Sequence, residues 1–200
     1  PELIVNSRKK LKASAGFDAI SQAIESIISK KSTKKSVDFA LKSLKISLKY
    51  YLEHLNNPTM NNSYKMCLAA NFSGRAISIS KTTAPHALSY PFTSHFGISH
   101  GHAVSLTLND FLNFNFKNIN VSECNFDLKN RYKKLFNVSK TSNINDFNSL
   151  IKQIKSKAKL ESNFSKLGIN IKENLPKILS GVNEQRLSNN PIKIRKEDIK

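Results

Sequence analysis

The sequence predicts an all-α fold, a multi-helix bundle, on the basis of three observations. Apolar residues recur at helical spacing through most of the 200-residue chain. Asn, Pro and Ser stand between these segments, at the places where helices are expected to end and begin. There is no internal repeat and no alternating apolar run with a hairpin signal, which would indicate a sheet. At this length we expect residues 1–200 to form a single domain.

The first part of the chain is expected to form three amphipathic helices. The first covers about 17–30, where Phe and Ile recur on one face. The second covers 36–55, with Ser36 as its N-cap and the Asn-Asn-Pro run at 56–58 as its stop. The third begins near residue 61 or 62 and carries small residues, which suit close packing between helices.

The sequence changes character over residues 82–115, where Lys is absent and His, Pro and Gly are concentrated. Pro85 and Pro91 favour short helical starts, and Gly97 marks a turn. A further helix is expected over 99–114. This part of the chain therefore stands apart from the basic composition of the rest.

The part of the chain after residue 118 returns to Lys-rich amphipathic segments, which we expect to form the outer layer of the bundle. They lie at about 125–137, 144–158, 161–167 and 173–181. The closing run 195–198 is typical of the first turns of a helix and has no room to continue. Residues 1–15 lack the order of regions that a secretory signal requires. Both ends are therefore expected to be cut, with the last helix truncated.

The formal charge of +18 raises the alternative of a basic helical module that binds nucleic acid. Such a module would bind with an affinity that falls steeply with salt. Lys is scattered over the whole length, however, so we do not expect a nucleic-acid partner. Apolar runs are too short for a membrane span, so no membrane partner is expected either. Cys67 and Cys124 show neither metal-binding nor disulfide spacing, which favours a cytoplasmic protein.

Four polar residues form a candidate metal site. Asp18 and Gln22 are four residues apart, so both project from one face of the first helix. His86 and His100 are fourteen apart, each near the start of a helical segment, so two imidazoles from adjacent helices can meet. One carboxylate oxygen with two imidazole nitrogens suits an open site for Fe²⁺ or Zn²⁺ that leaves room for a substrate oxygen.

Structural alternatives exist for each of these residues. Asp18 can be a carboxylate that the helix dipole favours, and Gln22 can be an ordinary surface amide. The histidines at 95–102 can cap helices or fill the core. His54, on a Lys-rich helix, is expected to lie at the surface. Ser89, Ser99 and His102 are candidates to support the ligands, beside the simpler role of hydrogen bonding at helix ends.

Two segments resemble the signature segments of the iron-containing alcohol dehydrogenase family, in the same order. They are GFDAISQAIES at 16–26 and the stretch GRAISISKTTAPHALSYPFTSHFGISHGHAVSLTL at 74–108. Members of that family bind their metal with an Asp and a His four apart and two further His fourteen apart. By this resemblance Asp18, His86 and His100 occupy three of the four positions, and Gln22 replaces the remaining His. The implied metal is Fe²⁺, or Zn²⁺ as in related glycerol dehydrogenases.

The resemblance implies the helical C-terminal half of an iron-type alcohol dehydrogenase, which has a dehydroquinate synthase-like fold. The N-terminal half would bind NAD(P)H, because this chain has no GxGxxG turn for the pyrophosphate and so no cofactor-binding residue of its own. The implied partners are that N-terminal domain and a small alcohol or aldehyde, and a homodimer is left open. A fragment of this kind is expected to be inactive alone.

In the whole enzyme, the resemblance implies a metal that acts as a Lewis acid on the alcohol oxygen while hydride passes to the nicotinamide. The motifs are most similar to the phosphonoacetaldehyde reductase branch, which suggests that aldehyde as substrate. Lys81 or Arg75 would orient its anionic group, although each can be a plain surface cation. Tyr90 stands where relatives have a further His beside the substrate, so we expect it to line that site. No catalytic residue is assigned, and a zinc glycerol dehydrogenase-like enzyme is the alternative.

Overall fold

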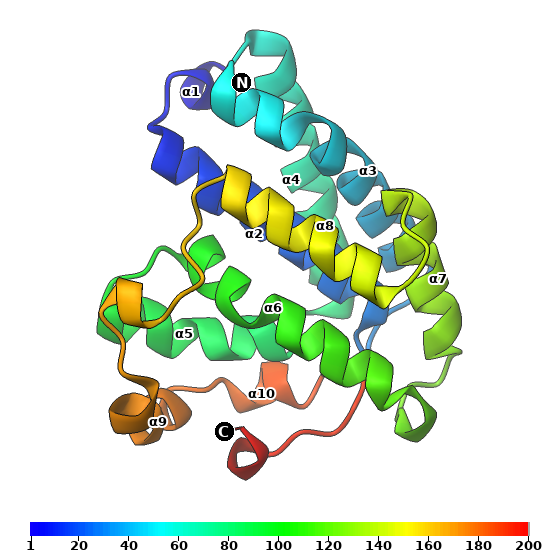
Figure 1. Ribbon diagram of the computed structural model, residues 1–200. Coiled ribbons are helices and arrows are strands. Elements are labelled where there is room, and N and C mark those ends of the chain that lie inside the picture. The colour runs from blue at the N-terminus through cyan, green and yellow to red at the C-terminus, as the bar shows by residue number, and fades with distance from the viewer. Residues whose placement is uncertain (200) are drawn as a thin grey trace.

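All of the observed secondary structure is helical. The structure, a computed structural model, describes residues 1–199, apart from the Glu197 side chain (Figure 1). There is no strand in that range, so the prediction of an all-α fold is confirmed. The helices are α1 (Glu2–Val5), α2 (Lys9–Ile28), α3 (Lys34–Asn56), α4 (Met60–Ser80), α5 (Ala84–Phe96), α6 (His100–Lys117), α7 (Leu128–Ser139), α8 (Ile144–Lys157), α9 (Ile171–Ser180) and α10 (Glu184–Leu187). None of these described helices is both long and apolar enough to cross a membrane.

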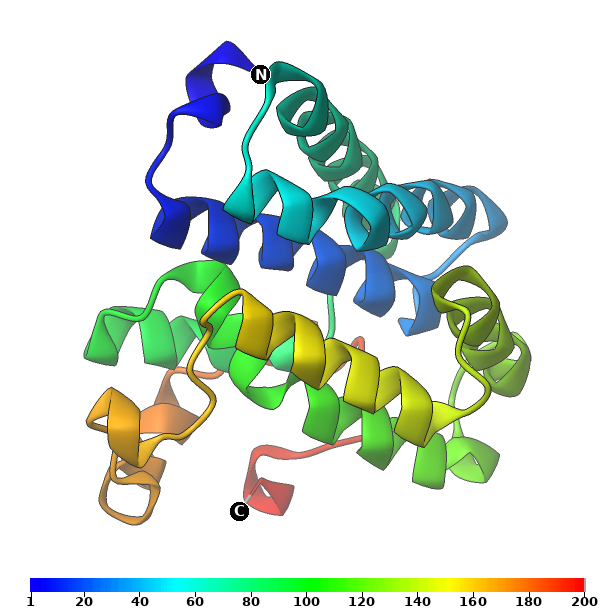
Figure 2. The same cartoon turned by 45° about the horizontal axis from the view of Figure 1, so that its top comes forward.

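Helix α2 lies at the centre of the arrangement. It packs against α3 and α4 on one side and against α6 on the other (Figures 1 and 2). Phe17, Ile20 and Ile24 are fully buried between these layers. The helix begins at Lys9, so the segment expected over 17–30 is its buried second part. Because packed helices surround it, α2 holds its polar side chains in defined positions.

Helices α3 and α4 each begin with a capping box. Thr33 caps α3: its Oγ1 accepts from the Ser36 N–H, and the Ser36 Oγ accepts from the Thr33 N–H. The prediction of Ser36 as the N-cap was therefore wrong by three residues, because Ser36 is the return partner in the box. Thr59 and Asn62 repeat this arrangement at the start of α4.

His54 is buried, contrary to the prediction that it lies at the surface. Only 3% of the residue is exposed, and its Nδ1 lies 3.2 Å from the Ser63 Oγ and 3.4 Å from the Asn62 Oδ1 of α4. It shares the apolar face of α3 with Tyr51 and Leu55, at helical spacing. The Lys-rich neighbours are on the other face of the helix and did not indicate this position. Burial lowers the pKa of His54.

Helices α5 and α6 form a helical hairpin. They are joined at Gly97, which has a φ of 66°, as the predicted turn requires. Pro85 lies in the first turn of α5, as predicted. Pro91 was expected to start a helix, but it lies inside α5. Proline has no N–H, so the carbonyl of Ala87 loses its helical partner. The N–H of Asn183 donates to that carbonyl instead, at 3.2 Å.

The Lys-rich second half forms α7, α8 and α9 close to the predicted ranges. The segment expected at 161–167 contains only a 3₁₀ turn over Ser165–Leu167, and the closing run forms a 3₁₀ turn over Lys196–Asp198. Any continuation of that predicted last helix at Lys200 lies outside the described residues. A small apolar core joins α5 and α6 to α9 and α10, so the C-terminal segment (residues 181–199) is attached to α5.

Helices α2 and α6 approach each other closely at Gly101. A Cβ at this position would lie 2.0 Å from the Ser14 carbonyl oxygen and 2.8 Å from the Asp18 Cβ. Backbone atoms cannot give way as a flexible side chain can, so the approach requires glycine. The neighbouring His100 is thereby held beside α2.

We expect Gly101→Ala to lower the free energy of unfolding by about 2 kcal/mol or more, because the new methyl group must push α6 away from α2. Gly74→Ala is the control, since Gly74 is an exposed position of α4 and its Cβ would meet nothing within 4 Å. That change should raise stability by about 0.5–1 kcal/mol. Urea unfolding of the three proteins measures both effects. Equal stabilities for the two variants would contradict the close approach.

Candidate metal centre

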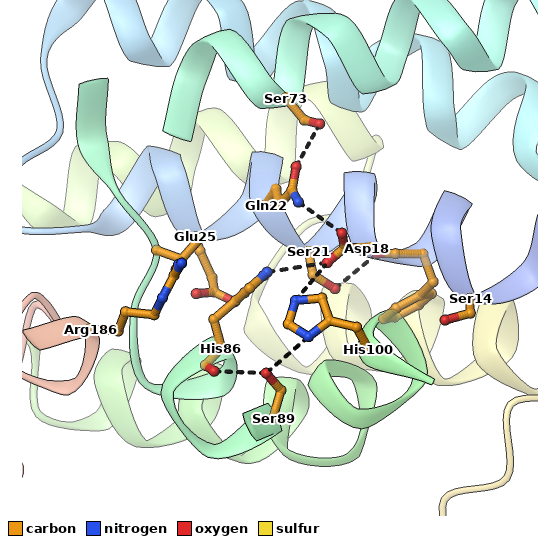
Figure 3. Close-up of polar contacts among 12 residues, drawn as sticks. Ser14, Asp18, Ser21, Gln22, Glu25, Ser73, His86, Ser89, His100 and Arg186 are labelled. Atoms are coloured by element: carbon orange, nitrogen blue, oxygen red, sulfur yellow. Dashed lines mark hydrogen bonds and ion pairs between the residues drawn. The ribbon is translucent and has the colours of Figure 1, made fainter. Parts of the chain in front are cut away.

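The structure brings Asp18 of α2, His86 of α5 and His100 of α6 together (Figure 3). The His86 Nε2 lies 3.2 Å from the Asp18 Oδ1, and the His100 Nε2 lies 3.8 Å from the same oxygen. One donor atom from each residue lies within 4.8 Å of the others. We call these residues the three-donor site. In this site Asp18 and His86, which are 68 positions apart in the chain, lie in direct contact.

The spacing of the three donors fits a single cation. Fe²⁺ and Zn²⁺ bind nitrogen and oxygen at about 2.0–2.2 Å, so ligands on one ion lie about 3–4 Å apart. The two separations from the Asp18 oxygen fall within that span. One carboxylate and two imidazoles are also a donor set that both ions accept. These residues therefore fit the metal that the sequence suggests.

Glu25 supports the site and was not identified from the sequence. Its side chain is fully buried, and its Oε1 lies 2.6 Å from the His86 Nδ1. Its other oxygen accepts from the Thr83 N–H at 2.6 Å and from the Thr83 Oγ1 at 2.9 Å. With the Nδ1–H donated to Glu25, the Nε2 of His86 faces Asp18.

A signal for Glu25 is present in the sequence. It lies seven residues after Asp18, on the same face of α2, within the otherwise apolar and small run at 23–28. A lone carboxylate in such a run must find buried partners, since an unpaired one is costly to desolvate. That reasoning predicts a partner for Glu25 but does not say which residue supplies it.

The two histidines differ in their electrostatic surroundings. Burial alone lowers the pKa of His86, but the charges of Glu25 and Asp18 and its hydrogen bonds to both raise that pKa to about 9. Burial lowers the pKa of His100, and the neighbouring His86 and Arg186 lower it further against the attraction of Asp18.

Gln22 contacts the site through its amide NH₂. The Nε2 donates to the Asp18 Oδ2 at 2.8 Å, and the Oε1 accepts from the Ser73 Oγ of α4 at 2.9 Å. In this arrangement Gln22 orients the carboxylate, and its amide oxygen is turned toward α4. Its role as a ligand stays a prediction.

The three candidate supporting groups have different surroundings. The Ser89 Oγ lies 3.4 Å from the His100 Nδ1 and donates to the His86 carbonyl at 2.8 Å. The Ser99 Oγ is buried with no hydrogen-bond partner among the described residues. The His102 Nε2 lies 2.7 Å from the Glu161 carbonyl. Of the three, Ser89 is the one in contact with the three-donor site.

The predicted substrate contacts also differ in position. The Tyr90 ring centroid lies 6.1 Å from that of His100, beside the site. The Lys81 Nζ donates to the Ser78 carbonyl, at the end of its own helix. Arg75 lies over the Phe39 ring of α3. Tyr90 is thus the predicted substrate contact that lies next to a donor.

The fold and the three donors define a class: an all-α domain with a candidate site for one metal ion between its helices. This chain belongs to the Fe-containing alcohol dehydrogenase family, whose C-terminal domain model matches residues 12–200. It is 32% identical over 117 residues to the phosphonoacetaldehyde reductase of Streptomyces viridochromogenes, an alignment that covers 58% of this chain and 29% of that protein.

Two solved structures extend the likeness to the whole chain. The sulfoacetaldehyde reductase of Bifidobacterium kashiwanohense, in complex with NAD⁺, is 27% identical, with a TM-score of 0.86 over 99% of this chain and 50% of that one. An iron-containing alcohol dehydrogenase from Thermotoga maritima is 24% identical, with a TM-score of 0.77 over 98% and 48%. That second likeness shows the shared fold. The chain spans about half the length of these solved relatives.

We expect a pH-dependent stability from His86 once a chelator has removed any metal. Its folded pKa of about 9 exceeds the unfolded value near 6.5, so its contribution is complete below pH 6.5 and is lost as the pH rises through 9. The loss should be a few kcal/mol, since each pKa unit corresponds to about 1.4 kcal/mol. Glu25→Gln should flatten this dependence, because it removes the charge that favours protonated His86. Urea unfolding between pH 6 and pH 9.5 measures the difference between the two proteins.

The wild type must be compared with Glu25→Gln because Lys155 also makes the stability depend on pH. Burial lowers its pKa to about 8, which gives the opposite pH dependence between pH 8 and the unfolded pKa. The contribution is the same in both proteins and cancels in the difference. A wild-type curve parallel to that of Glu25→Gln would contradict the proposed pairing of Glu25 with His86.

Proposed function

We propose that this chain is the metal-binding half of an NAD(P)-dependent alcohol dehydrogenase or aldehyde reductase. In this proposal Asp18, His86 and His100 bind one Fe²⁺, with Zn²⁺ as the alternative metal. The observation that carries it is the convergence of three donors from three helices, in a chain of this family. Gln22 stays a predicted fourth ligand.

The chain's own residues would prepare the site for chemistry. When bound, the cation would act as a Lewis acid toward the alcohol or aldehyde oxygen. Glu25 holds His86 by its Nδ1–H, so the Nε2 is directed into the site before any ligand arrives. Asp18 is oriented by the Gln22 amide. His86 is almost fully buried, while His100 and Asp18 are half-exposed, so the open side of the site faces away from the core.

The nicotinamide cofactor would be bound by the half of the enzyme that precedes this domain in the family. This chain carries no glycine-rich phosphate turn. The sulfoacetaldehyde reductase that shares the fold was solved with NAD⁺. The substrate would then lie between two domains, one of which binds the cofactor and the other the metal.

Phosphonoacetaldehyde is the substrate that we propose. One relative is named for this aldehyde and another for sulfoacetaldehyde. Both compounds are two-carbon aldehydes with an acidic group on the carbon next to the carbonyl. Tyr90 and Lys81 stay predicted contacts for that substrate, and Tyr90 has the support of its position beside His100.

We expect His86→Ala and His100→Ala in the intact protein to lose bound metal on dialysis. Each should lower kcat/KM for aldehyde reduction by more than about 100-fold, because a direct ligand contributes more than a supporting residue. His95→Ala is the control, since that histidine is exposed at the end of α5. Elemental analysis and assays with NADH and NADPH measure these effects. Unchanged metal content in both variants would rule out the proposed site.

An experiment on the wild-type protein distinguishes Fe²⁺ from Zn²⁺ as the active metal. After the metal is removed with a chelator, Fe²⁺ or Zn²⁺ is added back and the rate is measured for phosphonoacetaldehyde and for glycerol. Recovery with Fe²⁺ and the aldehyde supports the proposal. Recovery with Zn²⁺ and glycerol supports the glycerol dehydrogenase-like alternative.

A further inference from the structure

Arg186, in helix α10, lies at the edge of the three-donor site (Figure 3). Its guanidinium carbon lies 5.5 Å from the centroid of the Tyr90 ring, and its Nη1 donates to the Thr82 Oγ1. The same Tyr90 ring lies 6.1 Å from the His100 ring. One aromatic ring therefore separates Arg186 from a proposed metal ligand.

The backbone around Arg186 is fixed to α5. The Asn183 N–H donates to the Ala87 carbonyl, which Pro91 leaves without a helical partner. The Asn183 Oδ1 in turn accepts from the Arg186 N–H at 2.9 Å, as an N-cap. The position of Arg186 is thus set by α5, the helix that also carries His86.

The guanidinium has capacity for another ligand. Among the described side chains, no carboxylate lies within 4.0 Å of it. Arginine has five N–H donors, and the contact with Thr82 engages one nitrogen. The cation–π contact with Tyr90 limits the motion of the planar group, which prepares it for a bidentate contact with an oxyanion. The residue is half-buried, so such a contact would be partly shielded from water.

The other basic candidates have different partners. Lys81 is exposed and donates to the Ser78 carbonyl, and Arg75 stacks on Phe39. Arg186 is the cation with a described contact to Tyr90.

We propose that Arg186, in contact with the Tyr90 ring, binds the acidic head group of the substrate, a phosphonate or a sulfonate, while the carbonyl faces the three-donor site. This inference rests on the proposed function and names the residue that selects acidic aldehydes. The acidic group and the carbonyl of such a substrate are on neighbouring carbons, which matches a cation placed just beyond the metal donors.

The test compares Arg186→Gln with the wild type in the intact, metal-loaded protein. We expect kcat/KM for phosphonoacetaldehyde and sulfoacetaldehyde to fall about 10- to 100-fold more than kcat/KM for propanal, because propanal has no head group. The kcat/KM of Arg186→Lys for the acidic aldehydes should lie between those of the wild type and Arg186→Gln, since lysine keeps the charge and loses the planar fork. The acidic aldehyde whose kcat/KM decreases more in Arg186→Gln carries the head group, phosphonate or sulfonate, that Arg186 binds.

Arg131→Gln is the matched control. Arg131 lies over the Phe126 ring in the same manner, with its guanidinium carbon 4.4 Å from the centroid, but it belongs to α7. This change should leave the preference for acidic aldehydes as it is in the wild type. A loss of that preference here would show that any arginine in contact with an aromatic ring has the effect, and would overturn the assignment to Arg186.

A binding measurement removes the dependence on turnover. Calorimetry with methylphosphonate should give a Kd at least about tenfold weaker for Arg186→Gln than for the wild type. Thermal melting checks that the variant is folded. If it is not, Tyr90→Leu serves instead, because removing the ring should also weaken methylphosphonate binding. Equal Kd values in wild type and folded variant would overturn the inference.

Failure of this inference differs from failure of the proposed function. A protein that reduces propanal and both acidic aldehydes with an unchanged ratio after Arg186→Gln overturns the role of Arg186 and leaves the enzyme assignment standing. A wild-type protein that reduces none of the three aldehydes with metal and either cofactor overturns both.

Discussion

The buried pair of Glu25 and His86 is the interaction on which the site depends. Glu25 lies in the central helix, and its two oxygens engage the first turn of α5 through Thr83 and His86. A carboxylate without exposure is tolerated because each oxygen has a donor. The pair therefore fixes α5 in register with α2. That register places the far nitrogen of His86 at Asp18, and the close approach at Gly101 adds His100 from the third helix.

Local patterns in the sequence predicted much of this structure. Helical periodicity gave α3, α6, α7, α8, α9 and the start of α4 to within about three residues, because each buries one continuous face. Helix α2 begins eight residues before the expected start at 17. The convergence of Asp18, His86 and His100 was predicted from their spacing and from the family resemblance. The spacings lie within single segments and do not depend on how the helices pack, whereas the meeting of the two segments was implied by the resemblance.

The features that the sequence did not reveal depend on distant contacts. His86 meets Glu25 across 61 positions, and Arg186 meets Thr82 across 104. His54 was misplaced for a related reason, since its burial depends on Ser63 and Asn62 of the next helix. Composition near His54 indicated a surface position, and the apolar run around Glu25 predicts a buried partner without saying which residue supplies it. Polar groups in a core find partners that local patterns do not specify.

The proline within α5 has a consequence for how substrate range can change. Its missing N–H leaves one carbonyl open, and the C-terminal segment occupies that position through Asn183. Asn189 and Asn190 of the same segment hydrogen-bond to Ser80, Thr82 and Asn115, so the segment is attached by its own contacts, apart from the central helix. If Arg186 selects the head group as proposed, divergence in this terminal region would alter which molecules are recognised while the central helix and the three-donor site are kept. Selectivity and chemistry would then be separable parts of one domain.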